Sequence, residues 1–324
     1  MPKKIIIYND LYYCGGTLVL SALCKTLREL GYDARVIFTR HFKSDANDRG
    51  GRRTHIWKLL FGIYLSHYIG KFLPNLKFVK WHSLPLTPLT TMPGIKIQYN
   101  PLFSRNNTII IYPESLYGDP LWGKNIVRWL LYHYRFTDSP EAFGKNDLFV
   151  CYREVFNDYG LNPELHSLHI NYFDSSLYRQ YNYGERHGNC YILRKGKNRA
   201  DLPQSFDGPV YDNDIPEEDL VKMFNEHEYC YSYDTQTFYS SIAAICGCKS
   251  IVVMEPGKTE KDYRKSDDRP HYGVAYGNSP EQLKYAENTR SLLLESLNFT
   301  ERNRSSALQF TKLLEKQFGK LKRI

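Results

Sequence analysis

Short, unbroken apolar runs alternate with segments of helical periodicity, and this alternation constrains the fold more than any other feature. The run KIIIY, from Lys4 to Tyr8, is followed by leucines at helical spacing from Leu20 to Leu30, and Gly31 ends that segment. An apolar run without polar alternation is typical of a parallel strand buried on both faces. The N-terminus therefore predicts a Rossmann-like β-α-β unit and an α/β fold.

The same pattern recurs to the end of the chain. Strands are predicted at residues 36–38, 108–112, 147–152, 189–193, 229–233, 250–254 and 271–276. Helices are predicted after Gly123, over residues 216–227, in the small-residue segment before Gly247, and in at least two pieces over 279–319.

A length of 324 residues suits two domains of about 150 residues each. We expect a Rossmann-like N-terminal domain over 1–165, an interdomain linker over 166–188 and a Rossmann-like C-terminal domain over 189–324. In one alternative the final helix packs back on the first domain. Two doubly wound domains facing a cleft place ligands at the carboxyl ends of the strands.

The net charge of +8 favours anionic partners such as nucleotide diphosphates or anionic lipid headgroups. The basic residues are dispersed and no nucleic-acid motif is present, so we expect no nucleic-acid partner. Seven cysteines without a CxxC pair indicate reduced thiols, and neither they nor the ten histidines have metal-site spacing. No signal peptide or membrane-spanning run is recognisable, which predicts a cytoplasmic protein.

The segment from His55 to Leu73 is apolar, aromatic and flanked by positive charge. It predicts a helix with two alternative roles. Core helices are the more common class. An amphipathic helix lying on an anionic membrane is the other, and it would make the protein peripheral on the inner face of the plasma membrane.

The stretch YDTQTFYSSIAAICGCKSIVV joins a strand end to a small-residue helix and another strand. Free N–H groups at a helix start bind anions, and nearby hydroxyls reach phosphate or sugar oxygens. An ordinary capped core helix is the alternative. The candidate ligand-binding residues here are Tyr233, Asp234, Thr235, Thr237, Ser240 and Ser241.

Two more loops follow predicted strands. Arg194, Lys195 and Lys197 come after the strand NCYIL and can neutralise a leaving diphosphate, although a basic turn in water is the alternative. Gly15 and Gly16 lie in the loop after the first strand, where glycine lets the backbone approach a ligand closely. The loop is not a GxGxxG fingerprint, so a nicotinamide site is poorly supported.

Two carboxylates stand just past strand ends in the N-terminal half, and either is a candidate general base. Glu114 is preferred over Asp10 by a small margin, and a turn or cap is the alternative for Asp10. The neighbouring candidates for acceptor binding are Asn9, Asn125 and Arg128, the last of which has a structural pairing with Glu114 as its alternative.

The stretch from Tyr233 to Val253, followed by EKDYR and YGVAYG, resembles the donor half of GT-B-fold glycosyltransferases. Upstream, IYPESLYGDPLWGKNIVRWLLY resembles a segment of bacterial polysaccharide-assembly members of that superfamily. The resemblance implies a metal-independent, hexosyltransferase-like enzyme without a cofactor. Its donor would be a nucleotide sugar, and its acceptor a bacterial surface polysaccharide or a lipid-linked glycan.

One departure from that family pattern concerns the donor's ribose. Many retaining members have a glutamate five residues before the helix-ending glycine, and Ile242 stands at that position here. Two alternatives therefore stay open: a nucleotide-sugar epimerase on the same fold, and a non-catalytic nucleotide-sugar-binding or scaffold protein.

Overall fold

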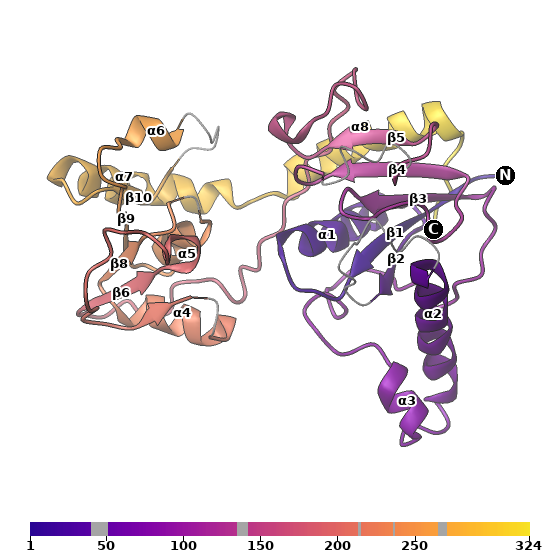
Figure 1. The fold of residues 1–324 in the computed structure, drawn as a ribbon, viewed down its shortest axis with the longest axis horizontal. Coiled ribbons are helices and arrows are strands. Elements are labelled where there is room, and N and C mark those ends of the chain that lie inside the picture. Colours follow the sequence, from indigo (N-terminus) through magenta and orange to yellow (C-terminus); the bar gives the residue numbers. More distant parts are fainter. Residues whose placement is uncertain (40–50, 135–141, 213–214, 236, 265–270) are drawn as a thin grey trace. The chain divides into compact units, whose positions relative to one another are not determined.

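The computed structural model describes residues 1–39, 51–134, 142–212, 215–235, 237–264 and 271–324, and side chains from residue 55 in the second range. The chain forms two compact units (Figure 1). Unit 1 contains Met1–Tyr172 and Phe299–Ile324, and unit 2 contains Phe173–Asn298. The first part of the predicted linker therefore belongs to unit 1, the rest of it belongs to unit 2, and the last helix belongs to unit 1.

Unit 1 is built on a five-stranded sheet with the order β2-β1-β3-β4-β5, in which neighbouring strands are parallel. Its strands are β1 (Lys4–Asp10), β2 (Ala34–Thr39), β3 (Thr108–Pro113), β4 (Asn125–Leu130) and β5 (Leu148–Cys151). Its helices are α1 (Gly15–Glu29), α2 (Gly51–Ile69), α3 (Lys77–His82) and α8 (Thr300–Phe318), with a short 3-10 turn at Glu154–Phe156.

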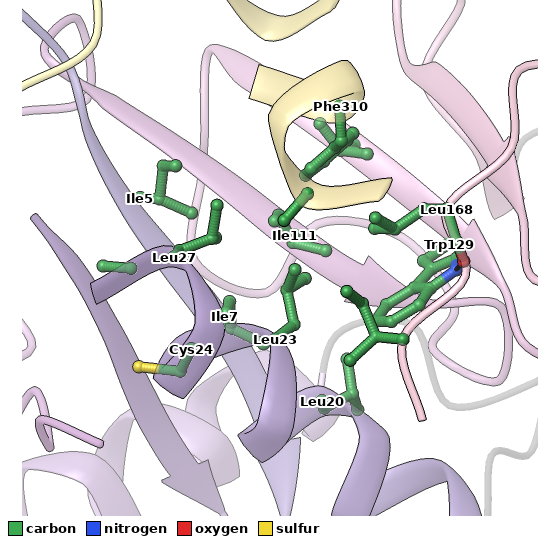
Figure 2. Close-up of a cluster of buried hydrophobic side chains, with 14 of the residues drawn as sticks. Ile5, Ile7, Leu20, Leu23, Cys24, Leu27, Ile111, Trp129, Leu168 and Phe310 are labelled. Atoms are coloured by element: carbon green, nitrogen blue, oxygen red, sulfur yellow. Dashed lines mark hydrogen bonds between the residues drawn. The ribbon is translucent and has the colours of Figure 1, made fainter. Parts of the chain in front are cut away.

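Both faces of this sheet are covered, which explains why β1 reads as an unbroken apolar run. Ile5 and Ile7 point into a core shared with α1 and α8, which Figure 2 shows with Phe310 above the sheet. Ile6 and Tyr8 point to the opposite face, where they join the core that includes α2. Alternation along a strand therefore buries every residue of the run.

The C-terminal segment completes unit 1. Ala307, Phe310 and Leu314 on α8 are buried in the core with α1. After α8 the tail runs along the N-terminal strand, and the amide of Lys322 donates to the carbonyl of Lys3 at 2.8 Å. The expected alternative, a final helix packed on the N-terminal domain, is what the structure contains.

The helix predicted after Gly123 is wrong, because the segment forms strand β4. Residues 126–130 are all buried between β3 and β5, and a fully buried strand has no polar alternation to distinguish it from a buried helix. Arg128 stands in this strand with a side chain only 1 % exposed, and its Nε donates to Asp147 Oδ2 at 2.7 Å.

Unit 2 is built on a second parallel five-stranded sheet, with the order β10-β9-β8-β6-β7. Its strands are β6 (Asn189–Ile192), β7 (Val210–Tyr211), β8 (Tyr229–Ser232), β9 (Lys249–Val252) and β10 (Val274–Tyr276). Its helices are α4 (Glu217–Glu226), α5 (Tyr239–Ile245), α6 (Glu260–Arg264) and α7 (Pro280–Ser296), with a 3-10 turn at Arg194–Gly196. The two-residue strand β7 was not predicted.

The two sheets have the same order of strands. In each unit the first strand lies second from one edge, with the second strand outside it and the other three in sequence on its other side. The predicted pair of doubly wound α/β domains is therefore present. Each sheet has a switch point at the carboxyl ends of its first and third strands, β1 with β3 and β6 with β8, where ligands bind in open α/β sheets. In the described parts of the chain, no helix is long and apolar enough to cross a membrane.

Arg128→Met is expected to lower the free energy of unfolding by about 3–5 kcal/mol, because the buried Asp147 carboxylate loses its cation. Urea denaturation of the full chain measures this. Lys25→Met is the matched control, since it removes an exposed i,i+4 pair with Glu29 and should change the same quantity by less than about 0.5 kcal/mol. Equal effects would contradict a structural role for Arg128.

Candidate functional site

Arg194 stands at the switch point of unit 2, directly after β6. Its φ of +40° is uncommon for a residue with a side chain, so the turn is strained and the surrounding contacts hold it. Nη1 donates to Thr237 Oγ1 at 2.9 Å, and the guanidinium lies 4.6 Å from the ring centroid of Tyr239. The loops after β6 and β8 therefore meet around one partly exposed cation.

Two buried polar atoms lie in the loop after β8 and in the first turn of α5. Asp234 is 4 % exposed, and its Oδ2 is 3.9 Å from Arg194 Nη1. Among the described residues, neither Asp234 Oδ2 nor Ser240 Oγ has a hydrogen-bond partner. A buried polar atom without a partner is costly, so both atoms are suited to hydrogen-bond a ligand.

Gly196 brings the two loops together. A Cβ on this residue would lie 2.3 Å from the carbonyl oxygen of Tyr233, so only glycine permits the observed approach of the two backbones. The position of Arg194 against the loop after β8 thus depends on a residue two positions further along the chain. The sequence analysis did not single out Gly196, although a glycine between two basic residues after a strand was a signal for it.

Arg199 follows the same turn, and its side chain joins two strand ends. Its guanidinium donates to the carbonyl oxygens of Tyr233, Val253 and Met254 and forms a bidentate pair with Asp201. These carbonyls lie just past the carboxyl ends of β8 and β9. Arg199 therefore fixes the loops after β8 and β9 relative to each other.

Helix α5 begins at Tyr239 and has only seven residues, so Asp234 and Thr235 lie in the turn that precedes it. Thr237 still serves the first turn, since its Oγ1 accepts from the amide of Tyr239 at 3.3 Å. Thr235 and Ser241 are half-buried, and the Tyr233 ring lies 5.2 Å from the Arg199 guanidinium. A helix this short has only a small dipole, so Arg194 is the positive group beside Asp234.

The Tyr239 ring, which packs against the Arg194 guanidinium, is itself held in place by a hydrogen bond. The Tyr239 hydroxyl donates to Glu217 Oε1 at 2.9 Å, and Tyr178 donates to the other oxygen of the same carboxylate. Burial raises the pKa of Tyr239, and the hydrogen bond with Tyr211 and the charge of Glu217 act in the same direction. Tyr239 is therefore a neutral phenol that packs on the cation.

The two lysines of the loop are placed differently from Arg194. Lys195 is exposed, and exposed Lys197 lies 3.6 Å from Asp212 Oδ2. Within the described ranges, no group of three or more His, Cys, Asp or Glu side chains is arranged to hold a metal ion.

Asp10 and the two N-terminal glycines lie at the switch point of unit 1. Asp10 Oδ1 accepts from the amide of Tyr12 at 2.9 Å, which forms the turn foreseen as the alternative. Gly15 and Gly16 are the first residues of α1, so the predicted glycine loop ends two residues earlier than expected, at Cys14. A Cβ on Gly16 would lie 3.7 Å from Leu131, which places the start of α1 beside the end of β4.

Glu114 follows β3 and is 8 % exposed. Its Oε2 accepts from the amide of Leu131 at 3.0 Å, so the carboxylate joins the carboxyl ends of β3 and β4. The structure thus gathers Asp10, Glu114 and the start of α1 at one edge of the sheet in unit 1.

The three predicted acceptor-binding residues need correction. Asn9 is fully buried, and its amide donates to the Thr17 carbonyl and to Ser21 Oγ, so it joins β1 to α1. Arg128 is buried with Asp147, which also replaces its predicted pairing with Glu114. Asn125 begins β4 and donates to the Thr108 carbonyl, which places it at the sheet edge opposite the carboxyl ends.

No protein-family model and no curated protein sequence matches the chain. Among solved structures, a glycotransferase of kitacinnamycin matches over 98 % of this chain and 100 % of its own, with 10 % identity and a TM-score of 0.38. A glycosyltransferase from Rickettsia africae matches over 98 % of both chains, with 9 % identity and a TM-score of 0.37. MurG of Acinetobacter baumannii matches over 97 % of this chain and 99 % of its own, with 11 % identity and a TM-score of 0.35.

Gly196→Ala is expected to lower the free energy of unfolding by about 1–3 kcal/mol, because the new methyl group collides with the Tyr233 carbonyl. Gly15→Ala is the matched control, since no atom lies within 4 Å of its Cβ and alanine favours the helix by up to about 1 kcal/mol. Urea denaturation of both variants measures the difference. A neutral Gly196→Ala would contradict the close approach of the two loops.

Proposed function

We propose that the chain is a glycosyltransferase that takes a sugar from a nucleoside diphosphate donor bound at the switch point of unit 2. The observation that carries this proposal is the juxtaposition of Arg194 with the buried Asp234 Oδ2, together with a second buried acceptor, Ser240 Oγ, in the first turn of the helix that follows the same loop. A diphosphate needs a cation, and a sugar or ribose needs hydrogen-bond acceptors for its hydroxyls. Both requirements are met within one pair of loops.

In the proposed reaction the bond between the anomeric carbon and the diphosphate oxygen breaks, and a bond to the acceptor oxygen forms. The acceptor hydroxyl gives its proton to a base, and the leaving diphosphate takes the bonding electron pair. Arg194 would stabilise the charge that develops on that leaving group, because it is held in place by Thr237 and Tyr239 before the substrate arrives.

The other residues of the donor loops have different roles in this proposal. Asp234 and Ser240 would accept from donor hydroxyls, because a carboxylate placed directly on a phosphate would repel it. The exposed Lys195 and Lys197 would raise the local concentration of the anionic donor. Tyr233, Thr235 and Ser241 are partly accessible and would line the same loops.

Unit 1 would bind the acceptor, and Asp10 is the better-placed base. Asp10 is partly exposed at the end of β1, whereas Glu114 is 8 % exposed and bonded to the amide of Leu131. A general base must reach the proton it removes. We therefore assign the base to Asp10 and a positioning role to Glu114, which reverses the preference drawn from the sequence.

Thermal-shift measurement with UDP, GDP, dTDP and the corresponding nucleotide sugars tests the donor site. A ligand that binds only the folded state raises the melting temperature, by several degrees at a concentration of about 100 times Kd. Arg194→Gln is expected to abolish that rise. Arg105→Gln, on a cation that lies over Trp122 in unit 1, is the matched control and should leave it unchanged. The absence of a rise with every compound would contradict the donor site.

Release of nucleoside diphosphate from the donor tests the base. Asp10→Asn is expected to lower kcat by about 10²–10⁴-fold with little change in the donor's thermal shift. Glu114→Gln should have the smaller effect on kcat, because an amide oxygen can still accept from the amide of Leu131. A larger loss in Glu114→Gln would return the base to Glu114.

A non-catalytic protein that binds nucleotide sugars is the second candidate, and one observation favours it. Ile242, at the position where the resembling family has a glutamate, is buried in the core of unit 2 and is not available to a ribose. A thermal shift that is lost in Arg194→Gln, together with no nucleotide release under any condition, would select this candidate.

A further inference from the structure

Helices α2 and α3 and the loop between them carry a group of exposed apolar side chains. Six apolar residues of this segment are at least 45 % exposed: Leu65, Tyr68, Phe72, Leu73, Leu76 and Trp81. Phe72 is 84 % exposed and Trp81 is 77 % exposed. Single exposed apolar residues are ordinary, but a contiguous group marks an interaction surface.

Helix α2 has two apolar stripes. Ile56, Leu60 and Ile63 have helical spacing and are buried, the first two of them in the core of unit 1. A second set with the same spacing, Phe61, Leu65 and Tyr68, is exposed. The buried stripe accounts for the packing of the helix on the sheet, so folding of unit 1 does not explain the second stripe.

The two helices form a fixed pair. A Cβ on Gly62 would lie 2.3 Å from His82 Cδ2, so glycine allows α3 to approach α2 closely. Between them lies a cavity of about 500 Å³ whose lining includes Trp57, Phe61, Leu65, Phe78, His82 and Trp122. The exposed surface therefore continues into an aromatic recess large enough for part of a hydrocarbon chain.

The charged residues of this segment have one sign. From Arg49 to Pro113 the sequence contains no Asp or Glu. Lys71, Lys77 and Lys80 are exposed among the apolar side chains, and the Lys71 ammonium lies 5.1 Å from the Tyr68 ring centroid. The basic residues among 40–50, and the side chains of 51–54, lie outside the described residues.

We propose that α2, α3 and the loop between them bind an anionic lipid bilayer, with Phe72 and Trp81 in the acyl-chain region and the lysines at the phosphates. Aromatic residues with lysines beside them are the composition of helices that lie in the membrane interface. The surface is complementary to an anionic bilayer in two respects. Its exposed apolar side chains can enter the acyl-chain region, and its lysines can contact the phosphates. This proposal is independent of the donor site in unit 2.

Co-sedimentation of the full chain with vesicles tests the proposal. Binding is expected to vesicles of 30 % phosphatidylglycerol in phosphatidylcholine, and it should be much weaker with pure phosphatidylcholine or in 0.5 M NaCl. Phe72→Ser/Trp81→Ser should lower the partition coefficient at least about tenfold. Lys77→Ser and Lys80→Ser should each lower it about fivefold.

A matched control removes exposed apolar side chains elsewhere in unit 1. Leu102→Ser/Val155→Ser should leave the partition coefficient unchanged, because both residues lie away from α2 and α3 in the chain and are exposed. Circular dichroism and the melting temperature establish that each variant is folded. Lipids with brominated acyl chains should quench tryptophan fluorescence of the original chain and quench it less in Phe72→Ser/Trp81→Phe.

Several outcomes would overturn the proposal. One is no binding to either vesicle, and another is equal binding to charged and uncharged vesicles. A third is equal losses in the Phe72/Trp81 and control variants. A dimer in analytical ultracentrifugation that dissociates in Phe72→Ser/Trp81→Ser, without vesicle binding, would assign the surface to a second copy of the chain.

Discussion

Parallel pairing of the strands determines where everything else in this chain lies. Neighbouring strands that run in one direction need a crossover between them, and the crossovers bring all carboxyl ends of a sheet to one edge. Both sheets here have the same order of strands, so each unit has one switch point at that edge. Asp10 and Glu114 lie at one switch point, and Arg194 and Asp234 lie at the other.

The site in unit 2 shows how such an edge becomes a site for a charged ligand. Arg194 has an unfavourable φ, which costs about 1–3 kcal/mol. Such a conformation persists only because the surrounding contacts hold it. Its surroundings are the Thr237 hydroxyl, the Tyr239 ring and the close backbone contact at Gly196. The cation is therefore positioned by packing before any ligand binds. The free-energy cost of ordering its side chain is met during folding and not during binding.

Sequence patterns predicted most strands, the winding of the sheets and the return of the last helix, because buried parallel strands and amphipathic helices have strong periodic signals. They failed at β4, whose residues are buried on both faces and carry no period. Sequence patterns also placed Asn9 and Arg128 in a binding site. A sequence shows where a strand ends more clearly than it shows which way a side chain points. Alternation from Ile5 and Ile7 indicates that Asn9 faces α1, and this signal was available.

The candidate donor loops were found from polar residues after strands, and this reasoning identified Arg194, Asp234 and Ser240. It did not give their contacts. Whether a hydroxyl caps a helix or remains without a partner depends on where the helix begins, and α5 begins at Tyr239. Gly196 and Arg199 escaped because their roles depend on backbone atoms of distant strands.

The return of the last 26 residues to unit 1 makes unit 2 an insertion within the other unit. During synthesis the N-terminal end emerges first, yet the face of its sheet that α8 covers stays incomplete until the final residues leave the ribosome. Unit 2 has all of its own strands and helices before that moment. The unit that begins first is thus finished last, because the face of its sheet that Phe310 covers has no cover until α8 is made.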